Sequence, residues 1–202
     1  MATIPLFPLN SILFPRGRIS LQIFETRYVD LIRKCLRDQS GFGVVLIEEG
    51  SEVARPGQKL DIHRVGTYSH VVDWNELSSG LLGVTVEGKG TFRVIDSWKQ
   101  PNDLCMAEVA FREQDDVEAE PVDVGDEFQD YVDLLRGLSR HPMVEELKLE
   151  ISFENLREIA WRLADLLPIS NRDKQGLLEL EDPFDRLEQI DLFINSLHQQ
   201  ES

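Results

Sequence analysis

The chain has 202 residues, of which 42% are hydrophobic and 29% charged, and this composition is typical of a globular protein with a sizeable core. Its first residues carry no cationic stretch before an apolar run, and no segment approaches the roughly 18 apolar residues of a membrane span. We therefore expect neither a secretory signal nor contact with a membrane, and we predict a cytoplasmic protein.

The net charge of -16 is unevenly distributed along the chain. Residues 1–112 hold 13 basic and 13 acidic side chains, whereas residues 113–202 hold 8 basic and 24 acidic ones. The second half would repel a polyanion, and the first half has no basic stripe to attract one. We therefore expect no binding to nucleic acid.

The first 113 residues are typical of β structure with one helix. Short β-branched or alternating runs, separated by Gly, Pro, Asn and Asp, predict a compact sheet or barrel. The predicted strands cover residues 19–23, 42–47, 65–72, 81–86, 91–95 and 105–111. The helix follows the first of these strands, and its buried face is predicted from apolar residues at helical spacing, namely Tyr28, Leu31, Ile32, Cys35 and Leu36.

Residues 114–126 are acidic and poor in large apolar side chains, with Pro121 in the middle. Such a composition indicates a solvated connector. We therefore predict a β-rich module over residues 1–113, a connector over 114–126 and a second module over 127–202.

The second module has helical periodicity. Apolar stripes run from Phe128 to Leu138 and from Leu156 to Leu167. Two helix starts follow, a capping box at Ser170 and an Asp-Pro pair at residues 182–183, after which a last stripe continues to Leu197. These helices must bury their stripes, so an acidic bundle of about four helices is predicted.

Residues 83–90, Gly-Val-Thr-Val-Glu-Gly-Lys-Gly, satisfy all but the last position of a phosphate-binding loop. Gly90 stands where a serine or threonine hydroxyl would hold magnesium. The segment is also strand-forming inside and is followed by another predicted strand. We therefore interpret its glycines as a hairpin turn and expect no ATP binding.

No other constellation indicates catalysis or a cofactor. The four histidines, His63, His70, His141 and His198, lack the spacing of metal ligands, and Cys35 and Cys105 are expected to be buried thiols. The sequence contains no nucleophile elbow and no dinucleotide fingerprint. We therefore predict no catalytic residue, no metal site and no cofactor.

The opening of the chain carries its most distinctive pattern. Residues 4–9 are Ile-Pro-Leu-Phe-Pro-Leu, residues 14–15 are Phe-Pro, and residues 23–28 are Ile-Phe-Glu-Thr-Arg-Tyr. Taken alone, the prolines predict an edge strand, because proline cannot donate to a sheet ladder. The whole pattern, however, resembles the start of the Lon protease N-terminal domain.

The resemblance continues in register over nearly the whole chain. It includes Val65-Gly66-Thr67, the segment Val84–Val94, and the helical segments Leu163–Pro168 and Asp173–Glu179. One position departs from it, since Thr91 stands where the family usually has arginine before phenylalanine.

The resemblance implies an α+β protein: a partly open β-barrel similar in shape to the RNA-binding PUA fold, with one helix, followed by a helical bundle. It also implies a role in holding substrate polypeptide. Because the chain ends near the point where a Lon protease begins the helix leading to its ATPase, we expect the ATPase and protease regions to be absent.

We therefore predict a non-enzymatic module that recognises unfolded or apolar polypeptide and works with a protease or chaperone. Two alternatives remain open: a small-molecule-binding or enzymatic barrel, and a structural homo-oligomer. The predicted binding residues are apolar side chains of turns and loops in the neutral module, namely Leu13, Phe14, Phe24, Tyr28, Trp74 and Leu77. The alternative for Trp74 is that it folds back and closes the core.

Overall fold

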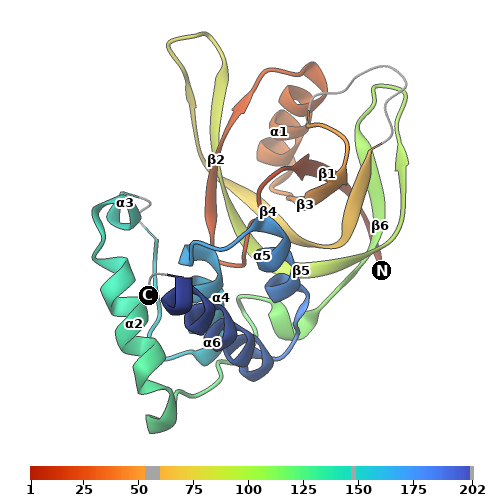
Figure 1. Ribbon diagram of the computed structural model, residues 1–202. Coiled ribbons are helices and arrows are strands. Elements are labelled where there is room, and N and C mark those ends of the chain that lie inside the picture. The colour runs from red at the N-terminus through yellow and green to blue at the C-terminus, as the bar shows by residue number, and fades with distance from the viewer. Residues whose placement is uncertain (53–59, 147–148, 201–202) are drawn as a thin grey trace. The chain divides into compact units, whose positions relative to one another are not determined.

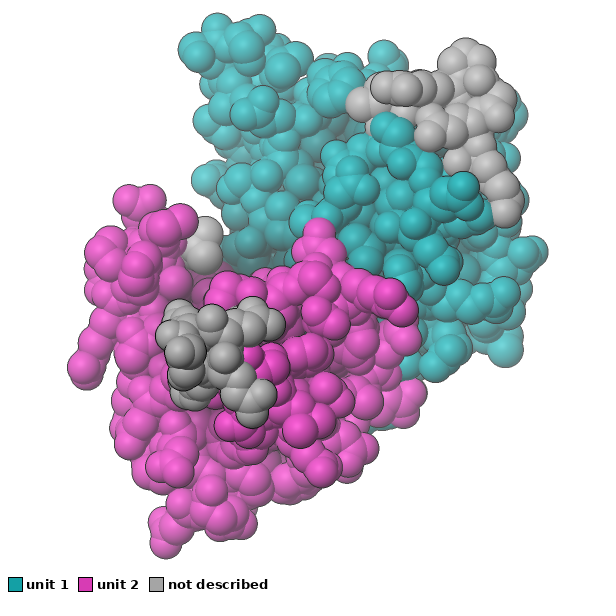
Figure 2. Space-filling view, viewed as in Figure 1, with its two compact units in different colours: residues 1–117 teal, residues 118–202 magenta. Residues whose placement is uncertain are grey.

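The computed structural model describes residues 1–52, 60–146 and 149–200, with side chains described up to residue 196. The chain divides into two compact units, unit 1 over Met1–Val117 and unit 2 over Glu118–Ser202, which Figure 2 colours separately. The division falls inside the acidic segment 114–126. The fold is α+β, as predicted.

Unit 1 contains six strands and one α-helix among its described residues. The strands are β1 (Ala2–Leu9), β2 (Arg18–Ile23), β3 (Phe42–Glu49), β4 (Asp61–Glu76), β5 (Leu82–Lys99) and β6 (Cys105–Phe111). The helix α1 (Thr26–Asp38) follows β2, and a short 3₁₀ turn, η1 (Glu113–Asp115), follows β6.

The strands form one sheet in the order β2-β5-β4-β3-β1-β6, and β6 also pairs with the second half of β5. The sheet therefore curls into a partial ring, with β2 attached to β5 outside it (Figure 1). This arrangement confirms the partly open barrel that was predicted. Helix α1 lies against the barrel, and its face buries Tyr28, Leu31, Ile32 and Cys35 in the core.

Strand β1 is an interior strand, so the prediction of a proline-containing edge strand is wrong. It pairs antiparallel with β6 over Ala2 to Leu6 and parallel with β3 over Leu6 to Leu9. Each proline therefore lies where only one neighbouring strand is paired: Pro5 opposite β6 and Pro8 opposite β3. The pairing with β6 ends at Leu6, where the pairing with β3 begins. Neither proline is therefore paired on both sides, and its missing N–H group is tolerated.

Strand β5 is continuous from Leu82 to Lys99, so the predicted hairpin turn at Gly88 and Gly90 is also wrong. The glycines have a packing reason instead. A β-carbon on Gly88 would lie 2.4 Å from the carbonyl oxygen of Phe14, and one on Gly90 would lie 3.2 Å from the Cα of Asp116. The chain at Phe14 therefore leaves no room for a side chain at Gly88, and the chain at Asp116 packs tightly against Gly90.

The true hairpin lies between β4 and β5. Strand β4 continues to Glu76, so Trp74 belongs to the strand and only residues 77–81 form the loop that was predicted to begin at residue 73. Gly80 adopts a positive φ of 77° there, which glycine allows without strain.

The segment after β6 is less solvated than expected. Asp115 is completely buried, and its carboxylate accepts a 2.7 Å hydrogen bond from the hydroxyl of Thr91 on β5. The N–H of Val117 donates to the carbonyl of Lys89. These bonds hold the beginning of the acidic segment on unit 1, because a buried carboxylate needs donors.

Unit 2 consists of helices around a common core. They are α2 (Gln129–Ser139), preceded by the 3₁₀ turn η2 (Asp126–Phe128), then α3 (Pro142–Glu145), α4 (Leu156–Leu166), α5 (Asn171–Glu179) and α6 (Pro183–Gln200). Helix α4 is buried along most of its length and contacts α2, α5 and α6. The four long helices match the predicted bundle, and α3 adds one short turn.

Both predicted helix starts in this unit are confirmed. The Ser170 hydroxyl accepts a hydrogen bond from the N–H of Asp173, and the Asp182 carboxylate accepts one from the N–H of Phe184. Leu187 and Ile190 are buried, but Phe184 is 48% exposed. The side chain of Leu197, the last residue of the predicted stripe, lies outside the described side chains.

Candidate functional site

Unit 1 contains an apolar groove of about 490 Å3. It lies where β2 runs into α1 and where the tip of the β4–β5 hairpin stands beside them (Figure 1). The groove is lined by Ile23, Phe24, Val29, Ile32, Arg33, Leu36, Trp74, Glu76, Gly80, Leu81 and Leu82. Two stretches of the chain, residues 23–36 and 74–82, therefore build it.

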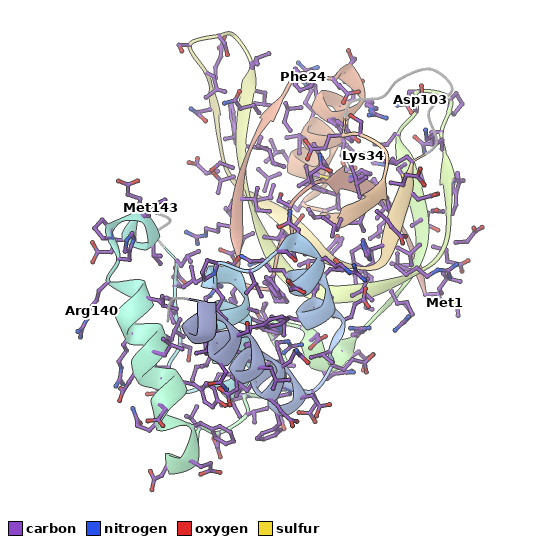
Figure 3. The ribbon with its side chains drawn as sticks, in the orientation of Figure 1. Met1, Phe24, Lys34, Asp103, Arg140 and Met143 are labelled. Atoms are coloured by element: carbon purple, nitrogen blue, oxygen red, sulfur yellow. The ribbon has the colours of Figure 1, made fainter. Side chains whose placement is uncertain are left out.

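Phe24 and Trp74 are the two large aromatic side chains of the groove, and each is 59% exposed. Phe24 lies between the end of β2 and the start of α1, and Figure 3 labels it at that end of unit 1. Trp74 pairs with Val84 across the hairpin. Contiguous exposed apolar surface of this kind usually marks an interaction site.

Leu36 of α1 adds to the same surface. Helical spacing predicted that it would be buried with the rest of its stripe, but it is 40% exposed and lines the groove. Its helix neighbour Ile32 is fully buried and, with Ile23, is part of the core beneath. The groove is thus an uncovered part of the barrel core's own apolar layer.

The structure brings together only part of the predicted binding set. Phe24 and Trp74 share the groove, and the exposure of Trp74 contradicts the alternative in which it closes the core. Leu77 is half-buried in the hairpin loop and is not part of the groove lining.

Leu13, Phe14 and Tyr28 are core residues, so the expectation that they supply exposed apolar surface is wrong. Leu13 and Phe14 are 2% and 0% exposed. The reason is the close packing of their segment on the sheet, where the hydroxyl of Thr67 donates to the carbonyl of Leu13. Tyr28 is 4% exposed, and its ring stacks on that of Phe7 with centroids 4.0 Å apart.

Sequence reasoning missed the groove residues contributed by α1, by the end of the β4–β5 loop and by the start of β5, among them Leu36, Leu81 and Leu82. Each belongs to an apolar pattern that is explained by core packing. The local sequence does not show whether a neighbouring element covers an apolar residue or leaves it exposed.

The groove carries little charge. Arg33 and Glu76 are its charged lining residues, one of each sign, and Arg33 also lies 3.7 Å from Asp30 in an exposed ion pair. Exposed pairs of this kind contribute little and are screened by salt. The groove therefore offers mainly apolar contact.

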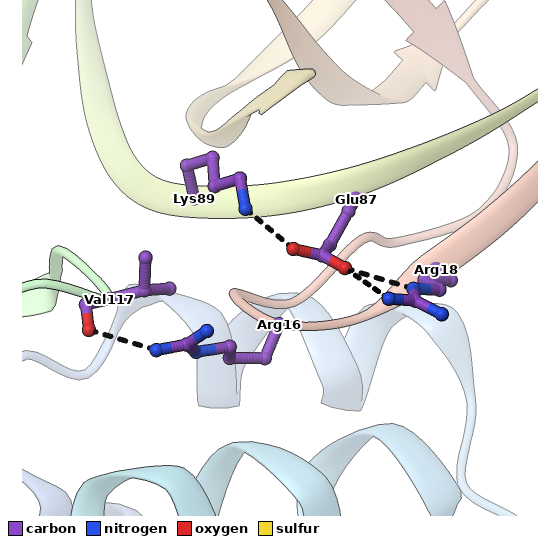
Figure 4. A network of polar contacts seen from close by, with 5 residues as sticks. All are labelled: Arg16, Arg18, Glu87, Lys89 and Val117. Carbon is purple, nitrogen blue, oxygen red and sulfur yellow. Dashed lines mark hydrogen bonds and ion pairs between the residues drawn. The ribbon is translucent and has the colours of Figure 1, made fainter. Parts of the chain in front are cut away.

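A separate polar network lies on unit 1 around Glu87, which is 8% exposed (Figure 4). One carboxylate oxygen accepts hydrogen bonds of 2.9 and 2.7 Å from Arg18, and the other accepts one of 2.6 Å from Lys89. Arg16 donates nearby to the carbonyl of Val117.

The hydrogen bonds from Arg18 and Lys89 give the Glu87 carboxylate a structural role. Burial acts to raise the pKa of Glu87, but the hydrogen bonds from Lys89 and Arg18 outweigh it and lower the pKa below its ordinary value. The carboxylate therefore stays ionised and bonded at neutral pH, which does not suit proton transfer.

Both cysteines are free thiols buried in unit 1, as predicted. Burial raises the pKa values of Cys35 and Cys105, so neither is a reactive thiolate at neutral pH. Among the residues that the structure describes, no three His, Cys, Asp or Glu side chains gather where they could hold a metal ion. In the same part of the chain, no helix has the length and apolar character needed to cross a membrane.

Comparison with known proteins identifies the family. The family model for the ATP-dependent protease La (LON) substrate-binding domain matches residues 3–196. The chain belongs to this family. The resemblance seen in the opening motif is therefore confirmed across both units.

Solved structures of the family share the fold. The Lon N-terminal domain protein from Xanthomonas campestris is 31% identical, with a TM-score of 0.75 over 94% of this chain and 97% of that one. The N-terminal domain of a Mycobacterium avium complex Lon protease covers 94% of this chain and 96% of its own, with a TM-score of 0.59. At 15% identity it shows likeness of fold alone.

Longer relatives contain the same region. A LON peptidase N-terminal domain and RING finger protein from Schizosaccharomyces pombe is 23% identical over 97% of this chain, and Lon protease 1 from Bacillus subtilis is 25% identical over 96% of it. The matched regions make up 46% and 25% of those proteins, so this chain spans less than half of either relative.

Proposed function

We propose that this Lon-family chain recognises unfolded or apolar segments of other polypeptides through the groove between β2, α1 and the β4–β5 hairpin. The observation that carries the proposal is the exposure of Phe24 and Trp74, both 59% accessible, over one apolar groove. The substrate-binding role named for the family supports it.

In this proposal the chain performs no chemistry of its own and holds polypeptide for a protease or a chaperone. The groove offers aromatic and aliphatic contact with a single charge of each sign, which suits apolar side chains of varied sequence. The two free, buried thiols suit a reducing compartment, and we therefore place the activity in the cytoplasm.

The test is binding of a permanently unfolded protein, reduced and carboxymethylated α-lactalbumin, measured by fluorescence anisotropy. Replacing both Phe24 and Trp74 by alanine is expected to weaken binding by about 2 kcal/mol or more, roughly 30-fold, as for interface hot spots. The melting temperature should change little, because both side chains are mostly exposed.

Trp98→Ala is the matched control, because Trp98 is 42% exposed on β5 but does not line the groove. It should leave the affinity unchanged, and the affinity of the unaltered chain should depend weakly on salt. Equal losses in Trp98→Ala and in the groove variant would contradict the proposed site. Assembly of the chain without ligand, or turnover of a small molecule, would favour the two alternative functions.

A further inference from the structure

Strand β2 has an unusual position in the sheet. Among the described residues it pairs only with β5, in an unbroken register from Arg18↔Glu87 to Ile23↔Leu82. In the part of the chain that the structure describes, its other edge is therefore unpaired, and residues 19–23 carry no proline, charge or bulge. Proteins usually protect free edges with one of these features, because an unpaired edge pairs readily with another extended chain.

The direction of the backbone groups along β2 follows from the residue before it. The N–H of Gly88 on β5 donates to the carbonyl of Gly17. Backbone groups point to alternate sides along a strand, so those of Ile19, Leu21 and Ile23 point to β5. The N–H and C=O groups of Ser20 and Gln22 then point to the free edge, and the side chains of these two residues are also exposed.

A second hollow, of about 170 Å3, lies beside residues 20–23 of β2 and continues to Glu25, and its charged lining residues are Glu25 and Glu52. Its apolar walls include Phe7 and Leu9 of β1 and Tyr28 of α1. Strand β6 pairs with β1 only as far as Leu6, so none of the described strands pairs with Phe7 and Leu9 on that side of β1.

The two hollows meet at the end of β2. Ile23 and Phe24 line both the groove that contains Trp74 and the hollow beside Tyr28. The unpaired edge of β2 therefore extends from the hollow beside Tyr28 to the groove that contains Trp74. An extended polypeptide matches such a site, because its backbone pairs with the donors and acceptors of the strand edge while its alternate side chains enter the hollows beside it.

We propose that the bound polypeptide is an extended segment that adds a strand to the free edge of β2, pairs with Ser20 and Gln22, and inserts apolar side chains into the two hollows. The inference rests on the proposed function and specifies the conformation of its substrate. Backbone pairing supplies affinity that is independent of sequence, and the hollows select for apolar side chains at intervals along the segment.

The first experiment uses the complete chain without substitution. Amide hydrogen exchange is measured by NMR, residue by residue, with and without a saturating ten-residue peptide of alternating Leu or Val and Ser or Thr. The amides of Ser20 and Gln22 are expected to exchange at least tenfold more slowly with the peptide. The amide of Leu21, which points to β5, should change much less.

A substitution tests the same pairing. Gln22→Pro removes one outward N–H and should lower peptide affinity at least tenfold, whereas Gln22→Ala loses the same side chain but keeps the N–H and should bind normally. The same peptide N-methylated at alternate residues should also bind at least tenfold more weakly to the unaltered chain. If Gln22→Pro does not fold, the hydrogen-exchange and N-methylation results still test strand addition to β2.

The possible failures are distinguishable. Peptide binding that depends on Phe24 and Trp74 without protection of Ser20 and Gln22 would leave the groove function intact and overturn strand addition. Absence of peptide and unfolded-protein binding would overturn both. A third outcome is that, without peptide, protection of these amides rises with protein concentration and analytical ultracentrifugation shows a dimer. This outcome would assign the edge to a second copy of the chain and overturn the inference.

Discussion

Thr91 illustrates how a single side chain holds two segments of unit 1 together. It precedes Phe92 on β5 and is 1% exposed. Its hydroxyl donates to the carboxylate of Asp115, which is fully buried, and Arg112 lies 3.9 Å from the same carboxylate oxygen. Thr91 therefore helps to satisfy a buried acid and holds the 3₁₀ turn η1 against β5.

Thr91→Val keeps the shape of the side chain and removes this hydrogen bond. We expect the free energy of unfolding to fall by about 1–3 kcal/mol, because the buried Asp115 carboxylate loses a donor. Urea denaturation followed by tryptophan fluorescence measures the change. Thr85→Val, at a half-buried position on the same strand, is the control and should cost no more than about 0.5 kcal/mol. Equal effects of the two substitutions would show that the Thr91 bond contributes nothing specific.

At the scale of elements, strand β5 organises unit 1. Its first half pairs with β2 and β4, and its second half pairs with β6. To serve three neighbours it must remain continuous through Gly88, where the chain at Phe14 and Pro15 crosses it closely. An uninterrupted strand also cannot supply the inward-turned amides of a phosphate-binding loop.

Gly88→Ala is expected to lower the free energy of unfolding by about 1–3 kcal/mol, because the added carbon would lie 2.4 Å from the backbone oxygen of Phe14. Gly137→Ala, in the exposed part of α2 with no atom within 4 Å of the added carbon, should instead raise stability by about 0.5–1 kcal/mol. Thermal and urea unfolding of both variants measure the difference in sign. Equal stability of Gly88→Ala and the parent chain would argue against the close crossing.

At the scale of the whole molecule, the acidic segment is attached to one unit at each end. Val117 bonds to Lys89 in unit 1. In unit 2, Arg157 donates to the carbonyl of Glu120, and Val122 exchanges hydrogen bonds with the segment at Asn155 and Leu156. We propose that residues 118–121, which include the first of these contacts with unit 2, are the connector of two separately folded modules.

A Glu-specific protease should therefore cut first after Glu118 or Glu120, both of which are exposed. Mass spectrometry of a timed digestion should show two large fragments, corresponding to units 1 and 2, before any smaller ones. The exposed Glu76 beside the β4–β5 loop serves as the internal comparison. Cleavage at Glu76 before cleavage in the connector would place the weakest backbone in the hairpin and contradict the proposed boundary.

The sequence alone determined the features that depend on neighbours along the chain. Helical spacing predicted the buried residues Tyr28 to Cys35 of α1, and capping patterns predicted the starts of α5 and α6. The opening motif led to the correct family and to the α+β class. These signals are local because helix faces and caps involve residues three or four positions apart.

Only the tertiary structure decided which distant segments meet. It placed β1 in the interior of the sheet, carried β5 through Gly88, buried Leu13 and Phe14, and left Phe24, Leu36 and Trp74 together in one groove. The physical reason is that apolar residues and glycines look alike in sequence whether the pairing of remote strands covers them, brings a backbone close to them, or leaves them open.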